Sequence, residues 1–253
     1  MIFDTHAHYD DEQFDEDRDE LLNSMPELGV GTIVNVSATY ESCARSVELS
    51  KKYPHVYAAV GIHPDEAGTL DEMKFAEMTK LFDNDKVVAV GEIGLDYYWD
   101  NEPHEVQAKW FIRQLELART KHLPVIIHSR EAAADTMYIM KNYAQDIKAV
   151  IHCYSYSVEM AEEYIKMGYY IGIGGVLTFK NAKKIKEVVK KVPLERILLE
   201  TDCPYLAPVP FRGKRNQSSY ISYVTEEIAQ LKGVSVEEVI EQTEKNAREF
   251  YGI

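Results

Sequence analysis

Short runs of β-branched and other apolar residues alternate along the chain with longer stretches in which apolar residues recur every three or four positions. The short runs are typical of buried parallel strands, and the longer stretches are typical of the helices that connect them. Eight such runs occur, at residues 2–6, 32–36, 56–61, 87–92, 124–128, 149–153, 170–174 and 196–202. Eight strand–helix units predict a TIM-type (β/α)8 barrel, an α/β fold that usually needs about 250 residues.

An open, doubly wound sheet is the alternative fold. It usually carries a Gly-rich phosphate loop after its first strand, where this chain has His6-Ala7-His8. Two further helices are predicted at residues 219–231 and 236–250, the first ended by Gly233 and the second begun by a capping box of Ser235 and Glu238. No linker or internal repeat is visible, so we predict a single domain over residues 1–253.

Polar residues gather where the predicted strands end, which is the end of a barrel that carries the catalytic groups. They are Asp4, His6 and His8 on the first strand, Glu92 on the fourth, His128 on the fifth, His152 on the sixth and Asp202 on the eighth. His6 and His8 are two residues apart, so both can point into one site. One such residue alone is more often a hydrogen-bonded core group, but the whole set favours a metal site. Imidazole and carboxylate ligands suit zinc and also admit manganese or magnesium.

Two further residues are expected to support this site. His63 follows the third strand in Gly61-Ile62-His63-Pro64, and we expect it to contact substrate or a ligand carboxylate rather than to bind metal directly. Glu200 lies two residues before Asp202 and should face the same side, so it is a candidate partner for a metal ligand.

The composition restricts the choice of partners and compartment. The net charge of −14, from 28 basic and 42 acidic residues, opposes general coating of nucleic acid, so any such contact must be local. The sequence shows no signal-peptide pattern and no apolar run of membrane-spanning length, so we predict a cytoplasmic protein without membrane contact or an obligate protein partner. Cys43, Cys153 and Cys203 are odd in number and far apart, which predicts reduced thiols.

Seven segments carry a resemblance to a known family. They are Phe3-Asp4-Thr5-His6-Ala7-His8, Gly61-Ile62-His63-Pro64, Gly91-Glu92-Ile93-Gly94-Leu95-Asp96-Tyr97, Pro124-Val125-Ile126-Ile127-His128-Ser129-Arg130, Ile151-His152-Cys153, Glu200-Thr201-Asp202-Cys203-Pro204-Tyr205-Leu206 and Arg212-Gly213-Lys214-Arg215-Asn216. In this order, over nearly the whole chain, they resemble the TatD-type deoxyribonucleases of the amidohydrolase superfamily. The resemblance implies a TIM-type barrel that holds two divalent ions. It places His6, His8, Glu92 and Asp202 around one ion and Glu92, His128 and His152 around the other, with Glu92 as the bridge.

The resemblance also implies an activity, the hydrolysis of phosphodiester bonds in DNA, with a 3′-to-5′ exonuclease action on single strands. Two magnesium, manganese or zinc ions about 3.5–4 Å apart can activate a shared water and neutralise charge on the phosphate. We expect Asp202 to serve as general base. With Glu92, the implied bridge between the ions, it makes up the predicted catalytic residues. The residues expected to contact substrate phosphate are Arg130, Arg212, Lys214 and Arg215, and those able to stack on bases are Tyr97, Tyr98, Trp99 and Tyr205.

Two other functions stay open. The same metal site can act on an ester or amide bond, as in an aminoacyl-tRNA deacylase or another amidohydrolase. Many of those relatives bridge their metals with a carbamylated lysine, whereas Lys86 precedes the fourth strand and Glu92 ends it, which favours the nuclease branch. A non-enzymatic protein that binds metal or a partner is the third possibility. The chain also departs from the family near Ser218, where the family usually has a proline before the next helix.

Overall fold

The computed structural model describes residues 1–99 and 101–253. Contacts within the chain divide it into a first unit, Met1–Asn35 with His152–Ile253, and a second unit, Val36–Ile151. Of the six residues that the family resemblance implies as metal ligands, four belong to the first unit: His6, His8, His152 and Asp202. The other two, Glu92 and His128, belong to the second unit. The single domain expected from the sequence stays a prediction.

The first unit contains strands at both ends of the chain. Its elements are β1 (Ile2–Ala7), η1 (Glu12–Phe14), α1 (Arg18–Ser24), β2 (Val30–Val36) except its last residue, α6 (Val158–Lys166), β7 (Tyr170–Ile173), η4 (Gly175–Thr178), α7 (Lys183–Lys191), η5 (Leu194–Arg196), β8 (Ile197–Leu199), η6 (Ser218–Tyr220), α8 (Ile221–Lys232) and α9 (Val236–Tyr251). β1 pairs in parallel with β2, and β7 with β8. A parallel bridge between Ala7 and Cys203 continues the pairing from β1 to the segment that follows β8.

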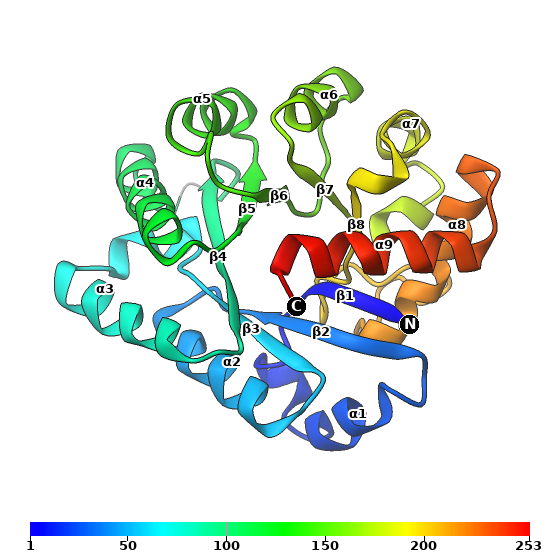
Figure 1. The fold of residues 1–253 in the computed structure, drawn as a ribbon, viewed down its shortest axis with the longest axis horizontal. Helices are drawn as coiled ribbons and strands as arrows, with labels where there is room; N and C mark the ends of the chain where they lie inside the picture. The colour runs from blue at the N-terminus through cyan, green and yellow to red at the C-terminus, as the bar shows by residue number, and fades with distance from the viewer. Residues whose placement is uncertain (100) are drawn as a thin grey trace. The chain divides into compact units, whose positions relative to one another are not determined.

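The last helix fastens the two ends of the chain together. In Figure 1, α9, in red, runs beside β1, in blue. The ring of Tyr251 stacks on Phe3 at 5.8 Å, and its buried hydroxyl donates a hydrogen bond of 2.7 Å to the Thr5 carbonyl. The N-terminal amine contacts Glu244 of α9 at 2.6 Å. These contacts fix β1, and with it His6, against the core of the first unit.

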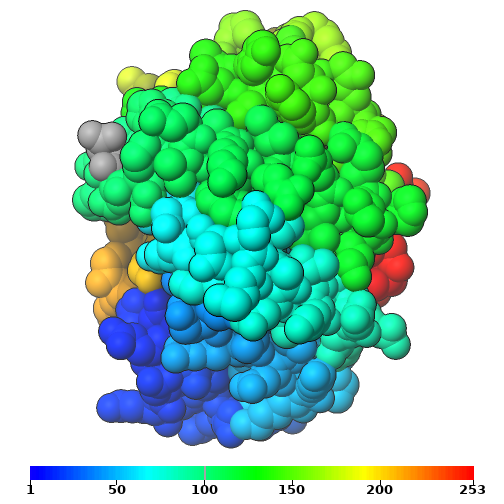
Figure 2. Space-filling model, turned by 90° about the vertical axis from the view of Figure 1, so that its left-hand side faces the viewer, coloured from blue at the N-terminus to red at the C-terminus, as the bar shows by residue number. Residues whose placement is uncertain are grey.

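The second unit consists of consecutive strand–helix repeats. Its elements are α2 (Tyr40–Lys52), β3 (Val56–Val60), η2 (Pro64–Thr69), α3 (Glu72–Thr79), η3 (Lys80–Asp83), β4 (Val87–Asp96), α4 (His104–Lys121), β5 (Val125–Arg130), α5 (Ala133–Tyr143) and β6 (Ala149–Ile151). β4 pairs in parallel with β3 and β5, and β5 pairs with β6. The residues of this unit, coloured blue to green in Figure 2, cover much of the face drawn there. Every residue of β4 is buried, as expected of a central parallel strand.

All eight predicted strands are present, and their ends differ from the prediction most in β4 and β8. β4 continues past residue 92 to Asp96, because Leu95 and Asp96 pair with Ser129 and Arg130 of β5. β8 ends at Leu199 instead of residue 202. Asp202 has a φ of +59°, in the left-handed region, which a strand residue does not adopt.

The predicted helices at the end of the chain are confirmed as α8 and α9. Gly233 ends α8 with a φ of +70°, a conformation that costs glycine little. The Ser235 side chain accepts a hydrogen bond of 3.1 Å from the Glu238 amide and so caps α9, which is one of the two bonds of the predicted capping box. The three cysteines are free thiols, as predicted. Among the described residues, we find no helix with the length and apolar character needed to span a bilayer.

Candidate metal centre

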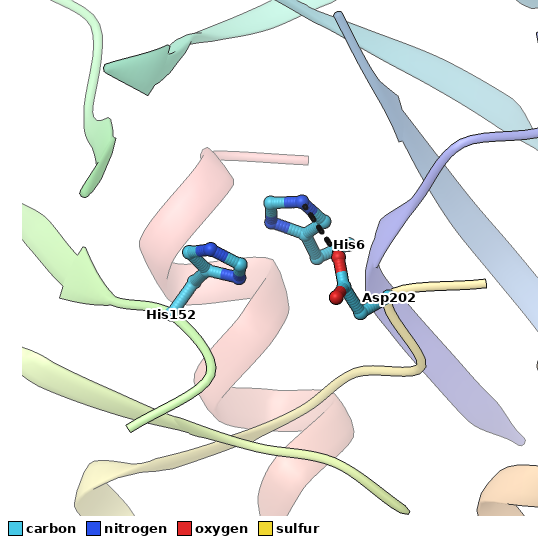
Figure 3. A group of neighbouring side chains, drawn as sticks. All are labelled: His6, His152 and Asp202. Carbon is cyan, nitrogen blue, oxygen red and sulfur yellow. Dashed lines mark ion pairs between the residues drawn. The ribbon is translucent and has the colours of Figure 1, made fainter. Parts of the chain in front are cut away.

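Three side chains that could bind a metal ion converge in the first unit. His6 lies in the buried strand β1, and Asp202 lies in the segment that follows β8. His152 begins the segment that leads to α6. Figure 3 shows their side chains pointing toward one another, and one ligand atom from each lies within 4.8 Å of the others. The imidazoles of His6 and His152 stack with ring centroids 4.0 Å apart. The strand-end pattern of the sequence therefore corresponds to a real cluster in this unit.

His8 completes this cluster and allows a test of whether the residues fit a metal ion. His6 Nε2 lies 3.1 Å from His8 Nε2, which lies 3.3 Å from Asp202 Oδ1, and the third side of the triangle is 3.7 Å. Ligand atoms bound at about 2.0–2.1 Å in a tetrahedron are separated by roughly 3.3 Å. The three atoms therefore have the spacing of donors around one small divalent ion, and the donor set fits such an ion.

The backbone around Asp202 explains how its carboxylate reaches the histidines. The Asp202 amide donates to the His6 carbonyl at 2.9 Å, while its own carbonyl accepts from Tyr205 at 2.9 Å. These bonds hold the left-handed turn that ends the strand. A non-glycine residue in that region costs about 1–3 kcal/mol, and such residues concentrate at functional sites. Cys153, directly after His152, also has a positive φ of +44°.

The electrostatic surroundings of Asp202 favour its charged form. Burial opposes ionisation, but a hydrogen bond from His8 and the charges of the neighbouring histidines outweigh it and lower the pKa of Asp202. Its carboxylate is thus available as a ligand or proton acceptor. Its side chain is 18% exposed, against 1% for His6, so solvent reaches the site from the Asp202 side.

Glu200 lies beside His152 rather than among the converging ligand atoms. Its Oε1 accepts a hydrogen bond of 2.5 Å from the Cys153 amide and lies 3.8 Å from His152 Nδ1. Its other oxygen, Oε2, is buried and accepts no hydrogen bond from the residues that the structure describes. Burial raises the pKa of Glu200 to about 8, partly offset by the nearby His152. Glu200 is therefore placed to orient His152, the kind of role expected from the sequence.

Asp4, a strand-end residue in the sequence pattern, has a structural role. Its buried carboxylate accepts hydrogen bonds from the Thr201 hydroxyl at 2.6 Å, the Thr201 amide at 3.0 Å and the Ser218 hydroxyl at 2.6 Å. Burial raises the pKa of Asp4 to about 6, and these hydrogen bonds act in the opposite direction. Asp4 thus joins β1 to the residue next to Asp202 and keeps the two ligand-bearing segments in register.

A second cluster lies entirely within the second unit. His128, on β5, contacts Glu92 through Nδ1 at 2.7 Å and Asp96 through Nε2 at 2.9 Å. His63 Nε2 lies 3.8 Å from Glu92, and the rings of His63 and His128 meet edge-on at 4.3 Å. Burial lowers the pKa of His128, but its hydrogen bonds to the two carboxylates raise it overall to about 9. His63, Glu92 and His128 also form a group able to hold a metal ion.

Two carboxylates of this cluster, Asp96 and Asp65, are not among the site residues predicted from the sequence. Asp96 is buried and accepts from His128, and it forms a further possible ligand group with His63 and Asp65. Its signal was available, because Asp96 lies four residues after Glu92 on the same strand and so faces the same side. Asp65 gave no such signal, since it follows Pro64 in the short helix η2. Burial, and then the charge of Asp96, raise the pKa of Asp65 to about 6.

The residues predicted to contact phosphate have different surroundings. Arg215 forms a bidentate ion pair with Asp17 at 2.5 and 2.8 Å and donates to the Gln13 carbonyl, which gives its guanidinium a structural task. Arg212 and Lys214 are exposed, with the Arg212 guanidinium 4.4 Å above the ring of Phe179. Arg130 is exposed in the second unit.

Comparison with known proteins defines the class. The chain is 44% identical over 254 residues to YabD of Bacillus subtilis and 36% identical over 256 residues to YcfH of Escherichia coli K12, both described as metal-dependent hydrolases. The first alignment covers 100% of both chains, and the second covers 99% of this chain and 96% of YcfH. With the clusters of histidine and carboxylate ligands described above, these similarities make the chain a metal-dependent hydrolase.

The family follows from a match over nearly the whole length. The family model described as TatD related DNase matches residues 3–252, so the chain belongs to the TatD family. The crystal structure of YjjV, a TatD homologue from Escherichia coli K12, superposes with a TM-score of 0.93 at 32% identity, covering 100% of this chain and 98% of that chain. The eight strands follow one another in chain order, and the predicted TIM-type (β/α)8 fold is confirmed.

Proposed function

We propose that this TatD-family hydrolase is a deoxyribonuclease that hydrolyses phosphodiester bonds in single-stranded DNA as a 3′-to-5′ exonuclease. The observation that carries the proposal is the triangle of His6 Nε2, His8 Nε2 and Asp202 Oδ1, with sides of 3.1, 3.3 and 3.7 Å. Such a set of nitrogen and carboxylate donors suits the metal-assisted attack of water on a phosphodiester. The description of the matching family as TatD related DNase supports the choice of DNA.

The proposed ligands are those that the family resemblance implies. His6, His8, Glu92 and Asp202 would hold one divalent ion, and Glu92, His128 and His152 the other. When bound, magnesium, manganese or zinc ions would supply an activated water and would neutralise the charge that develops on the phosphate oxygens. Within the second unit, the 2.7 Å contact between Glu92 and His128 supports a shared role for these two residues.

The remaining roles belong to the side chains themselves. The Asp202 carboxylate is partly exposed and would accept the proton of the attacking water as general base. Exposed Arg130, Arg212 and Lys214 would hold substrate phosphates, because guanidinium and ammonium groups form strong charge-assisted hydrogen bonds with them. We expect the protein to act in the cytoplasm.

The test is hydrolysis of single-stranded DNA labelled at its 5′ or 3′ end, by metal-free protein to which Mg²⁺, Mn²⁺ or Zn²⁺ is added back. Glu92→Ala and Asp202→Asn should each lose the metal-restored cleavage. Exposed Glu105→Ala on α4 is the matched control and should cleave like the wild type. Shortening of the 5′-labelled strand one nucleotide at a time would establish the 3′-to-5′ direction.

If the protein binds metal but cleaves neither DNA nor RNA, the nuclease proposal is wrong. Ester and amide substrates, including aminoacyl-tRNA, tested with the same variants would then identify the bond that is hydrolysed. If Asp202→Asn loses that hydrolysis, the proposed metal site stands and only the proposed substrate changes.

A further inference from the structure

Two large aromatic side chains are exposed in the segment that follows β4 in the second unit. Tyr98 is 54% exposed and Trp99 is 57% exposed. Their rings meet edge-on, with centroids 4.9 Å apart and an interplanar angle of 89°. Core packing does not account for this pair, because more than half of each side chain faces solvent.

A cation covers this aromatic pair. The Arg130 guanidinium lies 3.8 Å from the centroid of the Tyr98 ring and 5.5 Å from that of Trp99. Within residues 1–99 and 101–253, the exposed Arg130 guanidinium donates no hydrogen bond and forms no ion pair, while the backbone carbonyl of Arg130 accepts from the Tyr97 amide. In a protein with a net charge of −14, an exposed arginine that packs on aromatic rings presents a positive charge to an anion.

The backbone ties this group to the second cluster. Asp96 Oδ1 accepts from the Tyr98 amide at 2.9 Å and from the Trp99 amide at 3.4 Å. The other oxygen of Asp96 contacts His128 at 2.9 Å. Asp96 is also the β4 partner of Arg130 on β5. One buried carboxylate therefore fixes the aromatic residues, the arginine strand and a candidate metal ligand relative to one another.

The other aromatic residues considered for base stacking are engaged elsewhere. The Tyr97 ring stacks on His104 with centroids 3.5 Å apart, and its hydroxyl donates to Asp135 at 2.9 Å. The Tyr205 hydroxyl donates to Asp11 at 2.8 Å. These bonds fix the hydroxyl ends of both rings, whereas the contacts of Tyr98 and Trp99 are with each other and with Arg130.

We propose that Tyr98, Trp99 and Arg130 form a subsite that binds one nucleotide of single-stranded nucleic acid. Trp99 stacks on the unpaired base, Arg130 pairs with a phosphate, and Tyr98 holds the guanidinium in place. Stacking of this kind tolerates any base, because every base has a π-face. The inference rests on the proposed nuclease function. It names the residues that bind the DNA strand beside the candidate metal cluster.

The test measures binding separately from cleavage. Fluorescence anisotropy gives the Kd of the purified, metal-containing protein for a labelled phosphorothioate oligothymidylate, which resists hydrolysis, and for an abasic strand with the same backbone. Trp99→Ala should raise the Kd for the oligothymidylate about 5- to 150-fold and leave that for the abasic strand unchanged. Trp99→Phe should keep most of the affinity. Arg130→Gln should weaken both strands, and Tyr138→Ala, which removes a 63% exposed tyrosine of α5, should weaken neither.

Three results would overturn the subsite. The first is that the wild-type protein does not bind the oligothymidylate. The second is that the Kd of Trp99→Ala for the oligothymidylate lies within threefold of the wild-type value. The third is that Trp99→Ala loses as much affinity for the abasic strand as for the oligothymidylate. Cleavage of unmodified DNA in the same preparations tests the nuclease proposal separately. Trp99-dependent binding without cleavage would refute the nuclease function and leave the nucleotide subsite supported.

Discussion

Replacing Gly172 by alanine should damage the candidate metal centre of the first unit through Glu200. Gly172 lies in β7, where an added Cβ would stand 2.3 Å from Glu200 Oε2 and 2.9 Å from the Cα of His152. Restoring an ordinary contact of about 3.5 Å requires the carboxylate to move by roughly 1 Å. Because Glu200 also lines a small cavity with Leu177 and Ile185, it can move without unfolding the chain.

The displacement has a cost that can be worked out from the contacts of Glu200. Moving it breaks its hydrogen bond to the Cys153 amide and removes it from His152 Nδ1. Loss of a partner that orients a metal-binding histidine weakens metal affinity about 10- to 100-fold. Overpacking of a core by one methyl group costs about 1–3 kcal/mol of stability. We therefore expect Gly172→Ala to fold, with a clear loss in metal affinity.

The assay is a competitive titration of metal-free protein with zinc and a chromophoric chelator, together with urea unfolding. Gly31→Ala is the matched control, since its Cβ, also on a strand of the first unit, meets only the side chain of exposed Met1. The control should bind zinc like the wild type. A zinc affinity of Gly172→Ala within threefold of wild type would refute the reasoning, because the clash would then be absorbed without moving Glu200 or His152.

Three further predictions concern stability. Lys86 donates to four backbone carbonyls at 2.8–2.9 Å around the end of α2, so Lys86→Met should lose about 2–4 kcal/mol in urea unfolding, while Lys51→Met on the exposed face of that helix should lose almost none. Tyr251→Phe removes the buried hydrogen bond to Thr5 and should cost about 1 kcal/mol in the same assay, without loss of activity. Zinc at a hundred times its Kd should raise the unfolding free energy of metal-free protein by about 2.7 kcal/mol, and His6→Ala should abolish most of that gain in a thermal scan.

The fold could be predicted because buried parallel strands have a simple, recognisable pattern in the sequence. Their apolar, β-branched runs stand apart from the amphipathic helices, and all eight were found in the right order. The ends of the strands were less accurate. β4 extends to Asp96 because a neighbouring strand pairs with it, and β8 stops early because Asp202 turns into a left-handed conformation. Both effects depend on tertiary contacts, which hydrophobic periodicity does not encode.

The ligand residues were visible for a related reason. A histidine or aspartate at the end of an apolar run is unusual, and the fold brings the ends of parallel strands to one edge. The structure groups His6, His152 and Asp202 in this way within the first unit. Asp96 was overlooked because it stands beyond the apolar run that defined the predicted strand. Its position in the alternation, shared with Glu92, was the one usable signal.

The role of a polar residue near the site depends on hydrogen-bond partners that are far away in the sequence. Asp4 and Asp202 both stand at strand ends, yet Asp4 is enclosed by the hydroxyls of Thr201 and Ser218, whereas Asp202 faces the histidines. The Ser218 hydroxyl donates to Asp4, and the Ser218 amide donates to the Tyr9 hydroxyl at 3.0 Å. A proline at this position would supply neither donor. Ser218 therefore supports the scaffold behind the candidate ligands through both its side chain and its backbone.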